Sequence, residues 1–156
     1  ENLTFAAPDV GATNRIREIA SYFNAEMVIC DKHRKRANEI ASMVVIGDVT
    51  DRDVVLIDDI CDTGGTLAKS AGLLKEKGAR SVRALITHPV LSGKAYENIE
   101  NSVLEELVVC DTIPLKKESS KIKVVSVSEL FAVAIRNAYE NKSITSLFIH
   151  SQRKDK

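Results

Sequence analysis

The sequence lacks tryptophan and has few cysteines: among its 156 residues only Cys30, Cys61 and Cys110 carry a thiol. They form no CxxC pair and are odd in number, which favours reduced thiols in a cytoplasmic protein over a disulfide framework. No run of about 18 apolar residues and no basic, apolar leader occurs, so we expect neither a membrane-spanning helix nor a signal peptide. The first residue is Glu1 rather than methionine, and an apolar run follows at once, which suggests that upstream sequence is missing.

Net charge is absent as well, since 22 lysines and arginines balance 22 aspartates and glutamates. A neutral chain has no global field that would attract nucleic acid or a membrane surface, so we expect neither partner and expect any anion site to be local. Hydrophobic residues at 44% and charged residues at 28% are typical of a globular protein. The length predicts one domain with one core over residues 1–150, followed by a polar tail at residues 151–156.

Short runs rich in apolar and β-branched residues recur along the chain and predict buried strands. They lie at residues 3–7, 27–30, 54–57, 82–87, 107–110 and 122–125. Helical patterns separate several of these runs. Strands that alternate with helices predict a three-layer α/β domain with a parallel sheet, in which ligands bind at the carboxyl ends of the strands.

Three helices are predicted from apolar residues spaced three and four apart. Their apolar positions are Ile16, Ile19, Ala20 and Phe23 in the first, Leu67, Ala71 and Leu74 before a capping Gly78 in the second, and Leu130, Phe131, Ala134, Ile135 and Ala138 in the third. We expect Ser128 to be the N-cap of the third helix, and we expect its apolar positions to be buried.

The connection from residue 31 to residue 52 breaks this alternation. It opens with five basic residues at positions 32–36 and has a strand-like centre at residues 43–46. Its length and polarity predict a flexible hairpin flap, with residues 32–49 as the most mobile internal part of the domain.

The most specific segment is residues 54–66, in which an apolar strand ends in Asp58 and Asp59 and a Gly/Thr loop leads into a helix. Backbone N–H groups at the start of a helix lack intrahelical partners, so such a loop can wrap a phosphate without any lysine. The loop residues are Asp62, Thr63, Gly64, Gly65 and Thr66. The glycines permit close approach and positive φ, and the threonines add hydroxyl donors. The two aspartates would repel phosphate, so we expect them to bind sugar hydroxyls or Mg²⁺.

The paired aspartates followed by Asp-Thr-Gly-Gly-Thr resemble the phosphoribosyl pyrophosphate loop of type I phosphoribosyltransferases and of the pyrophosphokinases that share their fold. Other segments resemble the ribose-phosphate pyrophosphokinases in particular. These segments are residues 7–13, 31–34, 87–93, 111–114 and 143–148. In the first, Val10 and Ala12 replace a histidine and a glycine of the family pattern. In the second, His33 departs from the pattern. Together they cover nearly the whole chain and identify it as the C-terminal half of such an enzyme.

This resemblance implies a reaction and a set of residues. Pyrophosphate is transferred from ATP to the anomeric hydroxyl of ribose 5-phosphate, giving phosphoribosyl pyrophosphate for nucleotide biosynthesis. Lys32 and Arg34 are the implied catalytic residues, and Asp9 lies near Mg²⁺. Arg34, Asp58, Asp59 and the 62–66 loop are the implied binding residues for ribose 5-phosphate. The ATP site is implied to lie largely in a missing N-terminal half and a neighbouring subunit, so we expect a homo-oligomer and an inactive isolated chain.

Two alternatives remain at this point. A non-catalytic regulatory homologue would keep the fold for assembly alone, but it would have no use for Lys32, Arg34 or an intact 58–66 segment. A true phosphoribosyltransferase would share the phosphate loop, but it would lack the segments at 87–93, 111–114 and 143–148 and would need a nucleobase hood.

Overall fold

Seven strands form one sheet in the computed structural model, which describes residues 2–33 and 42–148. The strands are β1 (Leu3–Ala7), β2 (Glu26–His33), β3 (Ser42–Ile46), β4 (Asp53–Cys61), β5 (Ser81–Pro89), β6 (Glu106–Cys110) and β7 (Ile122–Val125). Their order across the sheet is β3-β2-β1-β4-β5-β6-β7. All neighbours pair in parallel except β2 and β3, which pair antiparallel. The predicted strands are therefore confirmed, and the predicted hairpin is present in its described part.

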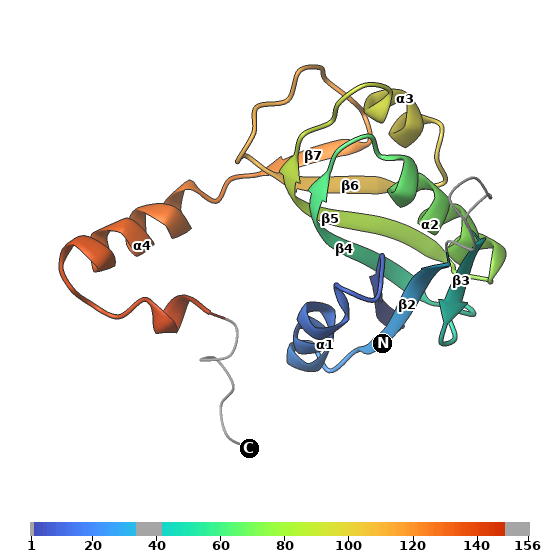
Figure 1. Ribbon diagram of the computed structural model, residues 1–156, viewed down its shortest axis with the longest axis horizontal. Coiled ribbons are helices and arrows are strands. Elements are labelled where there is room, and N and C mark those ends of the chain that lie inside the picture. Colours follow the sequence, from blue (N-terminus) through green and yellow to red (C-terminus); the bar gives the residue numbers. More distant parts are fainter. Residues whose placement is uncertain (1, 34–41, 149–156) are drawn as a thin grey trace.

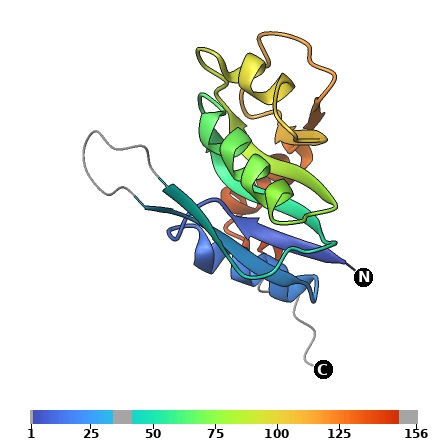
Figure 2. The same cartoon turned by 90° about the vertical axis from the view of Figure 1, so that its right-hand side faces the viewer.

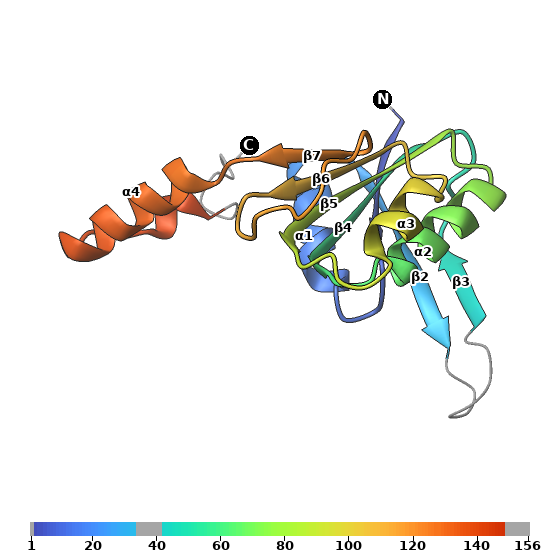
Figure 3. The same ribbon diagram turned by 90° about the horizontal axis from the view of Figure 1, so that it is seen from above.

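Helices cover both faces of this sheet (Figures 1, 2 and 3). They are α1 (Thr13–Tyr22), α2 (Gly65–Glu76), α3 (Ala95–Glu100) and α4 (Ser128–Tyr139), with a 3₁₀ turn η1 (Thr145–Leu147). Helix α1 lies on one face, and α2 and α3 lie side by side on the other, which confirms the three-layer prediction. Helix α3 was not predicted, because six residues are too few to show a helical period. Within the described ranges, no helix is both long and apolar enough to cross a bilayer.

The side chains of β4 show how the two sheet faces are separated. Val54 and Leu56 are buried on the α2 side, and Val55 and Ile57 pack on the α1 side, as the two-residue period of a strand requires. The larger core cluster lies under α2 and α3 and includes the fully buried Leu74. A fully buried side chain of this size contributes about 1.5–3 kcal/mol to stability. The smaller cluster packs β1 against α1, and its members are Phe5, Ala7, Ala12, Ile16 and Ala20.

The α1 face is only partly covered, because α1 lies over β1 and β2 and covers the strands beyond them less completely. Phe23, at the C-terminal cap of α1, is 57% exposed, and Leu85 of β5 is 37% exposed. An apolar hollow on this face is lined mainly by side chains of α1, β1 and β4–β6, with Phe5, Val55 and Val108 among them.

The prediction for the third helix was right in position and wrong in burial. Helix α4 begins at Ser128, but Val127 occupies the N-cap position and no side chain caps the helix. None of its residues is buried: Leu130 is 49%, Phe131 55% and Ile135 66% exposed. The reason is that α4 leaves the sheet at the end of β7 and projects away from the body of the domain (Figures 1 and 3). Its apolar stripe meets the segment that follows the helix, since Leu130, Phe131 and Ala134 line a hollow together with Ile144, Leu147 and Phe148, but this segment leaves the stripe largely exposed.

Two predictions fall wholly or partly outside the described residues. The polar tail at 151–156 is one of them. The flap is the other, since residues 34–41 are not described; its mobility stays a prediction.

Candidate functional site

The sheet has one point where its strand order reverses. From β1 the chain moves outward through β2 and β3 on one side and through β4 to β7 on the other, so β1 and β4 are neighbours at that point. In open parallel sheets, ligands bind in the crevice at the carboxyl ends of such strands. Asp9 follows β1 directly, and Asp58 and Asp59 belong to the last part of β4, so the topology brings these three sequence-predicted residues to the same crevice.

Strand β4 is longer than predicted, and this changes the setting of the two aspartates. The sequence predicted a strand ending at residue 57, but pairing with β5 continues to Cys61 and Pro89. Asp58 and Asp59 therefore lie within a paired strand rather than in a loop. Asp58 faces the crevice, and its carboxylate accepts a hydrogen bond from the backbone N–H of Asp59 at 2.9 Å.

The loop at residues 62–66 follows β4 and leads into α2. Gly64 is the N-cap of α2, with φ at +70°, a conformation that disfavours any residue with a Cβ. Thr63 and Thr66 are exposed. The loop and the end of β4 line a cavity of about 260 Å³, to which Asp9, Asp58, Asp62, Thr63, Gly64 and Thr66 all contribute. The structure therefore brings together six of the sequence-predicted site residues around one cavity.

A second hollow, of about 480 Å³, adjoins the first. Asp9 and Asp58 line both hollows, and Arg15 and Asp59 line the second. Two cavities that share a wall of carboxylates offer room for two ligand groups on either side of these side chains.

Arg15 is a site residue that the sequence analysis missed. Its guanidinium lies 3.3 Å from the Asp59 carboxylate and 3.6 Å from that of Asp58. It stands in the first turn of α1, the helix that directly follows β1. The available signal was topological, because a helix that begins at the carboxyl end of β1 places its first turn beside the end of β4.

The two aspartates of β4 differ in acidity. Burial raises the pKa of Asp58 to about 6, and the negative charges of Asp59 and Asp9 act in the same direction. Hydrogen bonding with Asp58, and then Arg15, lowers the pKa of Asp59. As the pH falls, Asp58 therefore takes up a proton before Asp59 does.

The described carboxylates suit a cation that the substrate helps to bind. Within residues 2–33 and 42–148, no three His, Cys, Asp or Glu side chains are arranged to hold a metal ion by themselves. Mg²⁺ is commonly held by one or two carboxylates together with substrate phosphates and water. Asp9 and Asp58 line the same cavity, and the charge of Asp9 raises the pKa of Asp58, so a cation between them would relieve their repulsion.

The predicted catalytic residues are located only in part. Lys32 lies on β2, beyond Ile29, which pairs with Ala7 at the end of β1. Its backbone therefore stands at the same sheet edge as Asp9. Arg34 lies outside the described residues.

Cys61 precedes the loop and is confirmed as a packing residue. It is 4% exposed, and burial raises the pKa of its thiol to about 11. The thiol therefore stays protonated at neutral pH, which argues against a nucleophilic role.

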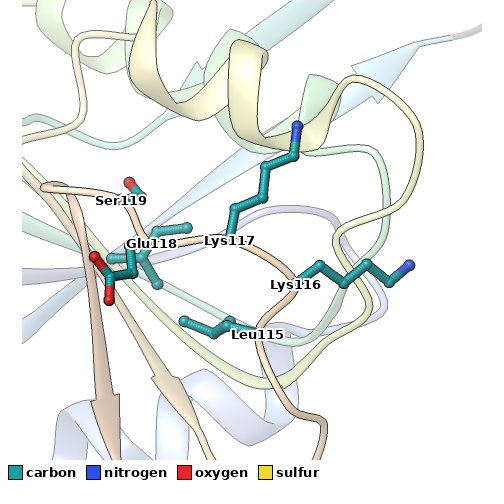
Figure 4. Close-up of a pocket in the computed structure, with 6 residues that line it drawn as sticks. Leu115, Lys116, Lys117, Glu118 and Ser119 are labelled. Carbon is teal, nitrogen blue, oxygen red and sulfur yellow. The ribbon is translucent and has the colours of Figure 1, made fainter.

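A further hollow of about 460 Å³ lies on the loop before β7, far along the sheet from this crevice (Figures 1 and 4). In Figure 4 the side chains of Lys116, Lys117 and Glu118 point in different directions. They form no converging set of polar groups, so this hollow is a poor candidate for a ligand site.

The sheet order, the two-glycine loop and the paired aspartates at the switch point define an α/β protein of the type I phosphoribosyltransferase-like class. Comparison with known proteins goes further. The family model described as phosphoribosyl synthetase-associated domain matches residues 16–149, and the chain belongs to that family, the family of the ribose-phosphate pyrophosphokinases.

Similar proteins agree with this assignment. The chain is 54% identical over 149 residues to the ribose-phosphate pyrophosphokinase of Campylobacter jejuni, a match that covers 96% of this chain and 48% of the relative. It is 55% identical over 148 residues to that of Wolinella succinogenes, covering 95% and 48% of the two chains. Among solved structures, phosphoribosylpyrophosphate synthetase from Mycobacterium smegmatis matches with a TM-score of 0.82 at 31% identity, covering 90% of this chain and 46% of that one. The chain thus spans about half the length of the relatives it matches.

Proposed function

We propose that the chain binds ribose 5-phosphate, with the 5-phosphate on the 62–66 loop and the ribose hydroxyls on Asp58 and Asp59. The observation that carries this proposal is the cavity of about 260 Å³ in which the loop and the carboxylates meet at the switch point of the sheet. Backbone N–H groups of the loop and of the first turn of α2, together with the Thr63 and Thr66 hydroxyls, supply the donors for a phosphate. The carboxylates are pure acceptors and suit sugar hydroxyls.

As part of the longer protein that its relatives represent, the chain contributes Lys32 and Arg34 to transfer of pyrophosphate from ATP to the anomeric hydroxyl. The nucleophile is already present in the substrate, so alignment and neutralisation of charge on the transferred group are what the protein must add. Lys32 supplies a point charge and Arg34 a bidentate fork. The position of Lys32 at the same sheet edge as Asp9 supports this role.

Mg²⁺ is the cofactor that the carboxylates fit, with Asp9 and Asp58 as its protein ligands. Bound there, the ion would neutralise charge on the ATP phosphates. Arg15 forms salt bridges with both aspartates of β4, at 3.3 Å from Asp59 and 3.6 Å from Asp58, so its charge offsets part of the repulsion between their carboxylates.

The remaining groups of the ATP site come from the other half of the longer protein and from neighbouring subunits. Two observations support such partners: the chain covers 48% of its relatives, and its apolar α4 stripe and bare α1-side sheet face are both exposed. Since misplacement of reacting groups by about 1 Å can lower a rate about 100-fold, the chain alone makes no phosphoribosyl pyrophosphate. The three free thiols favour a cytoplasmic location for the protein.

Calorimetric titration of the chain with ribose 5-phosphate, ATP and a panel of nucleobases tests these assignments. Binding of ribose 5-phosphate without any nucleobase is the expected result. A regulatory homologue would bind no ribose 5-phosphate, and a phosphoribosyltransferase would bind a nucleobase, so either outcome would overturn the proposal.

A further inference from the structure

The 62–66 loop is held from behind by a segment about thirty residues further along the chain. This segment, residues 91–98, comprises most of the connection from β5 to α3 and the first turn of α3, and it is called the brace below. The backbone N–H of Leu91 donates to the carbonyl of Cys61 at 3.0 Å, and the N–H of Ser92 donates to the carbonyl of Asp62 at 3.0 Å. The brace therefore holds the chain where β4 ends and the loop begins.

Two side chains of the brace complete this contact. The Asn98 amide donates to the carbonyl of Thr63 at 2.8 Å, and the Ser92 hydroxyl donates to the carboxylate of Asp62. Three consecutive carbonyls, those of residues 61 to 63, are thus bonded to the brace.

Bonding these carbonyls fixes the direction of the N–H groups in the same peptide units. A trans peptide is planar, so its carbonyl and the N–H of the next residue point in opposite directions. With the carbonyls of Cys61 and Asp62 facing the brace, the N–H groups of Asp62 and Thr63 face away from it. The brace therefore turns two donors of the loop outward.

Packing beneath Gly64 shows that the brace and the loop are closely fitted. A Cβ added to Gly64 would lie 3.4 Å from the Ala95 carbonyl and 3.5 Å from Ile99. Leu91 adopts a φ of +46°, an unfavourable value for leucine, and its side chain is 3% exposed. Such strain persists only where surrounding contacts enforce it, and it is often found beside functional sites.

We propose that Ser92 and Asn98 are positioning residues that hold the 62–66 loop in its phosphate-binding conformation before a ligand arrives. This proposal rests on the proposed function in assigning the ligand, but its first consequence concerns the free protein. Neither side chain lines the cavity, so both act through the loop.

The test uses Asn98→Ala and Ser92→Ala in the 156-residue chain, with Ser92→Thr as the variant that keeps the hydroxyl. Asn101→Ala is the matched control. Asn101 is the C-cap of α3, the helix that carries Asn98, and it is exposed. Its side chain makes no hydrogen bond with the described residues. Amide hydrogen exchange of the free proteins is measured over residues 60–68, with β5 as the internal reference. Affinity for ribose 5-phosphate is measured by calorimetry, and thermal unfolding is followed in parallel.

Asn98→Ala and Ser92→Ala should each speed exchange over residues 60–68 by about three- to tenfold, the change expected from one lost hydrogen bond. Exchange in β5 and the melting temperature should stay close to those of Asn101→Ala. The dissociation constant for ribose 5-phosphate should rise by a similar factor, because apparent affinity scales with the population of the competent loop. Ser92→Thr should restore both values.

Unchanged exchange over residues 60–68 in both alanine variants would overturn the proposal, as would a uniform rise over the whole domain. Wild-type chain that fails to bind ribose 5-phosphate, with loop exchange still raised by Asn98→Ala, would refute the proposed function and leave the positioning role standing. If the wild-type chain binds ribose 5-phosphate normally and neither alanine variant changes loop exchange or affinity, the positioning role is refuted and the proposed function stands.

Discussion

The conformation of Gly64 gives the sharpest stability prediction. Gly64 has φ at +70°, and a Cβ placed on it would meet the Ala95 carbonyl at 3.4 Å and Ile99 at 3.5 Å. These distances are ordinary contacts, so the effect of Gly64→Ala comes mainly from the left-handed backbone, which costs about 1–2 kcal/mol for an L-residue. For a chain of this length each 1 kcal/mol lowers the melting temperature by about 2–4 °C. Gly64→Ala should therefore lower the melting temperature by about 2–8 °C.

Gly72→Ala is the matched control for this experiment. Gly72 lies inside the same helix, α2, has no positive φ, and a Cβ placed on it would meet nothing within 4 Å. Replacing a glycine inside a helix by alanine stabilises by about 0.5–1 kcal/mol. The two variants, identical in chemistry, should thus shift the melting temperature in opposite directions.

Thermal unfolding monitored by circular dichroism, with urea unfolding as an independent measure, decides the matter. If Gly64→Ala is as stable as Gly72→Ala and binds ribose 5-phosphate normally, the left-handed conformation of the loop is wrong. If Gly64→Ala keeps its melting temperature but loses affinity for ribose 5-phosphate, the loop has rearranged to a conformation without backbone strain. Gly64→Val adds a β-branched side chain at the same point and should abolish ribose 5-phosphate binding; Gly65→Val is expected to do so as well.

Three further predictions concern single side chains. Lys32→Ala, in the longer protein, should lower turnover by several orders of magnitude with little change in melting temperature, since its charge acts mainly in the transition state; loss of ribose 5-phosphate affinity alone, seen in steady-state kinetics, would contradict this role. Because the pKa of Asp58 is raised to about 6 in the fold, its ionisation opposes folding at higher pH. Asp58→Asn should therefore melt above wild type at pH 7.5, and the difference should disappear as the pH falls from 6 to 4; a constant difference would show that ionisation is not its cause. Cys110 should react first with a thiol reagent in the native protein, because Cys30 and Cys61 are buried with pKa values of about 11, and equal reaction rates would refute their burial.

The positions of the strands along the chain follow closely from the sequence, because buried parallel strands appear as continuous apolar runs. The cavity residues could be predicted for the same reason, since Asp9, Asp58 and the 62–66 loop each follow such a run. Arg15 could not be predicted from its own neighbours, because its meeting with Asp59 depends on which strands lie side by side. Ser92 and Asn98 belong to the same category, since their hydrogen bonds join segments about thirty residues apart.

Helix α4 shows the opposite limit. Its apolar period predicted a buried helix, but none of its residues is buried, because the sequence does not say which surface would cover it. Ile144, Leu147 and Phe148 face part of the stripe, but Leu130, Phe131 and Ile135 remain exposed. An amphipathic pattern predicts that a face will be covered, and only the assembled protein identifies the partner.

Titration of the isotope-labelled chain with ribose 5-phosphate, followed by NMR, tests the central claim most directly. The account predicts saturable shifts in the amides of residues 58–66, competition by inorganic phosphate, and no such shifts with ribose alone. Loss of binding in Gly64→Val, with Gly72→Ala unaffected, completes the expected result. Binding that shifts amides elsewhere, or no binding at millimolar ribose 5-phosphate, would contradict the assignment of this loop as the phosphate site.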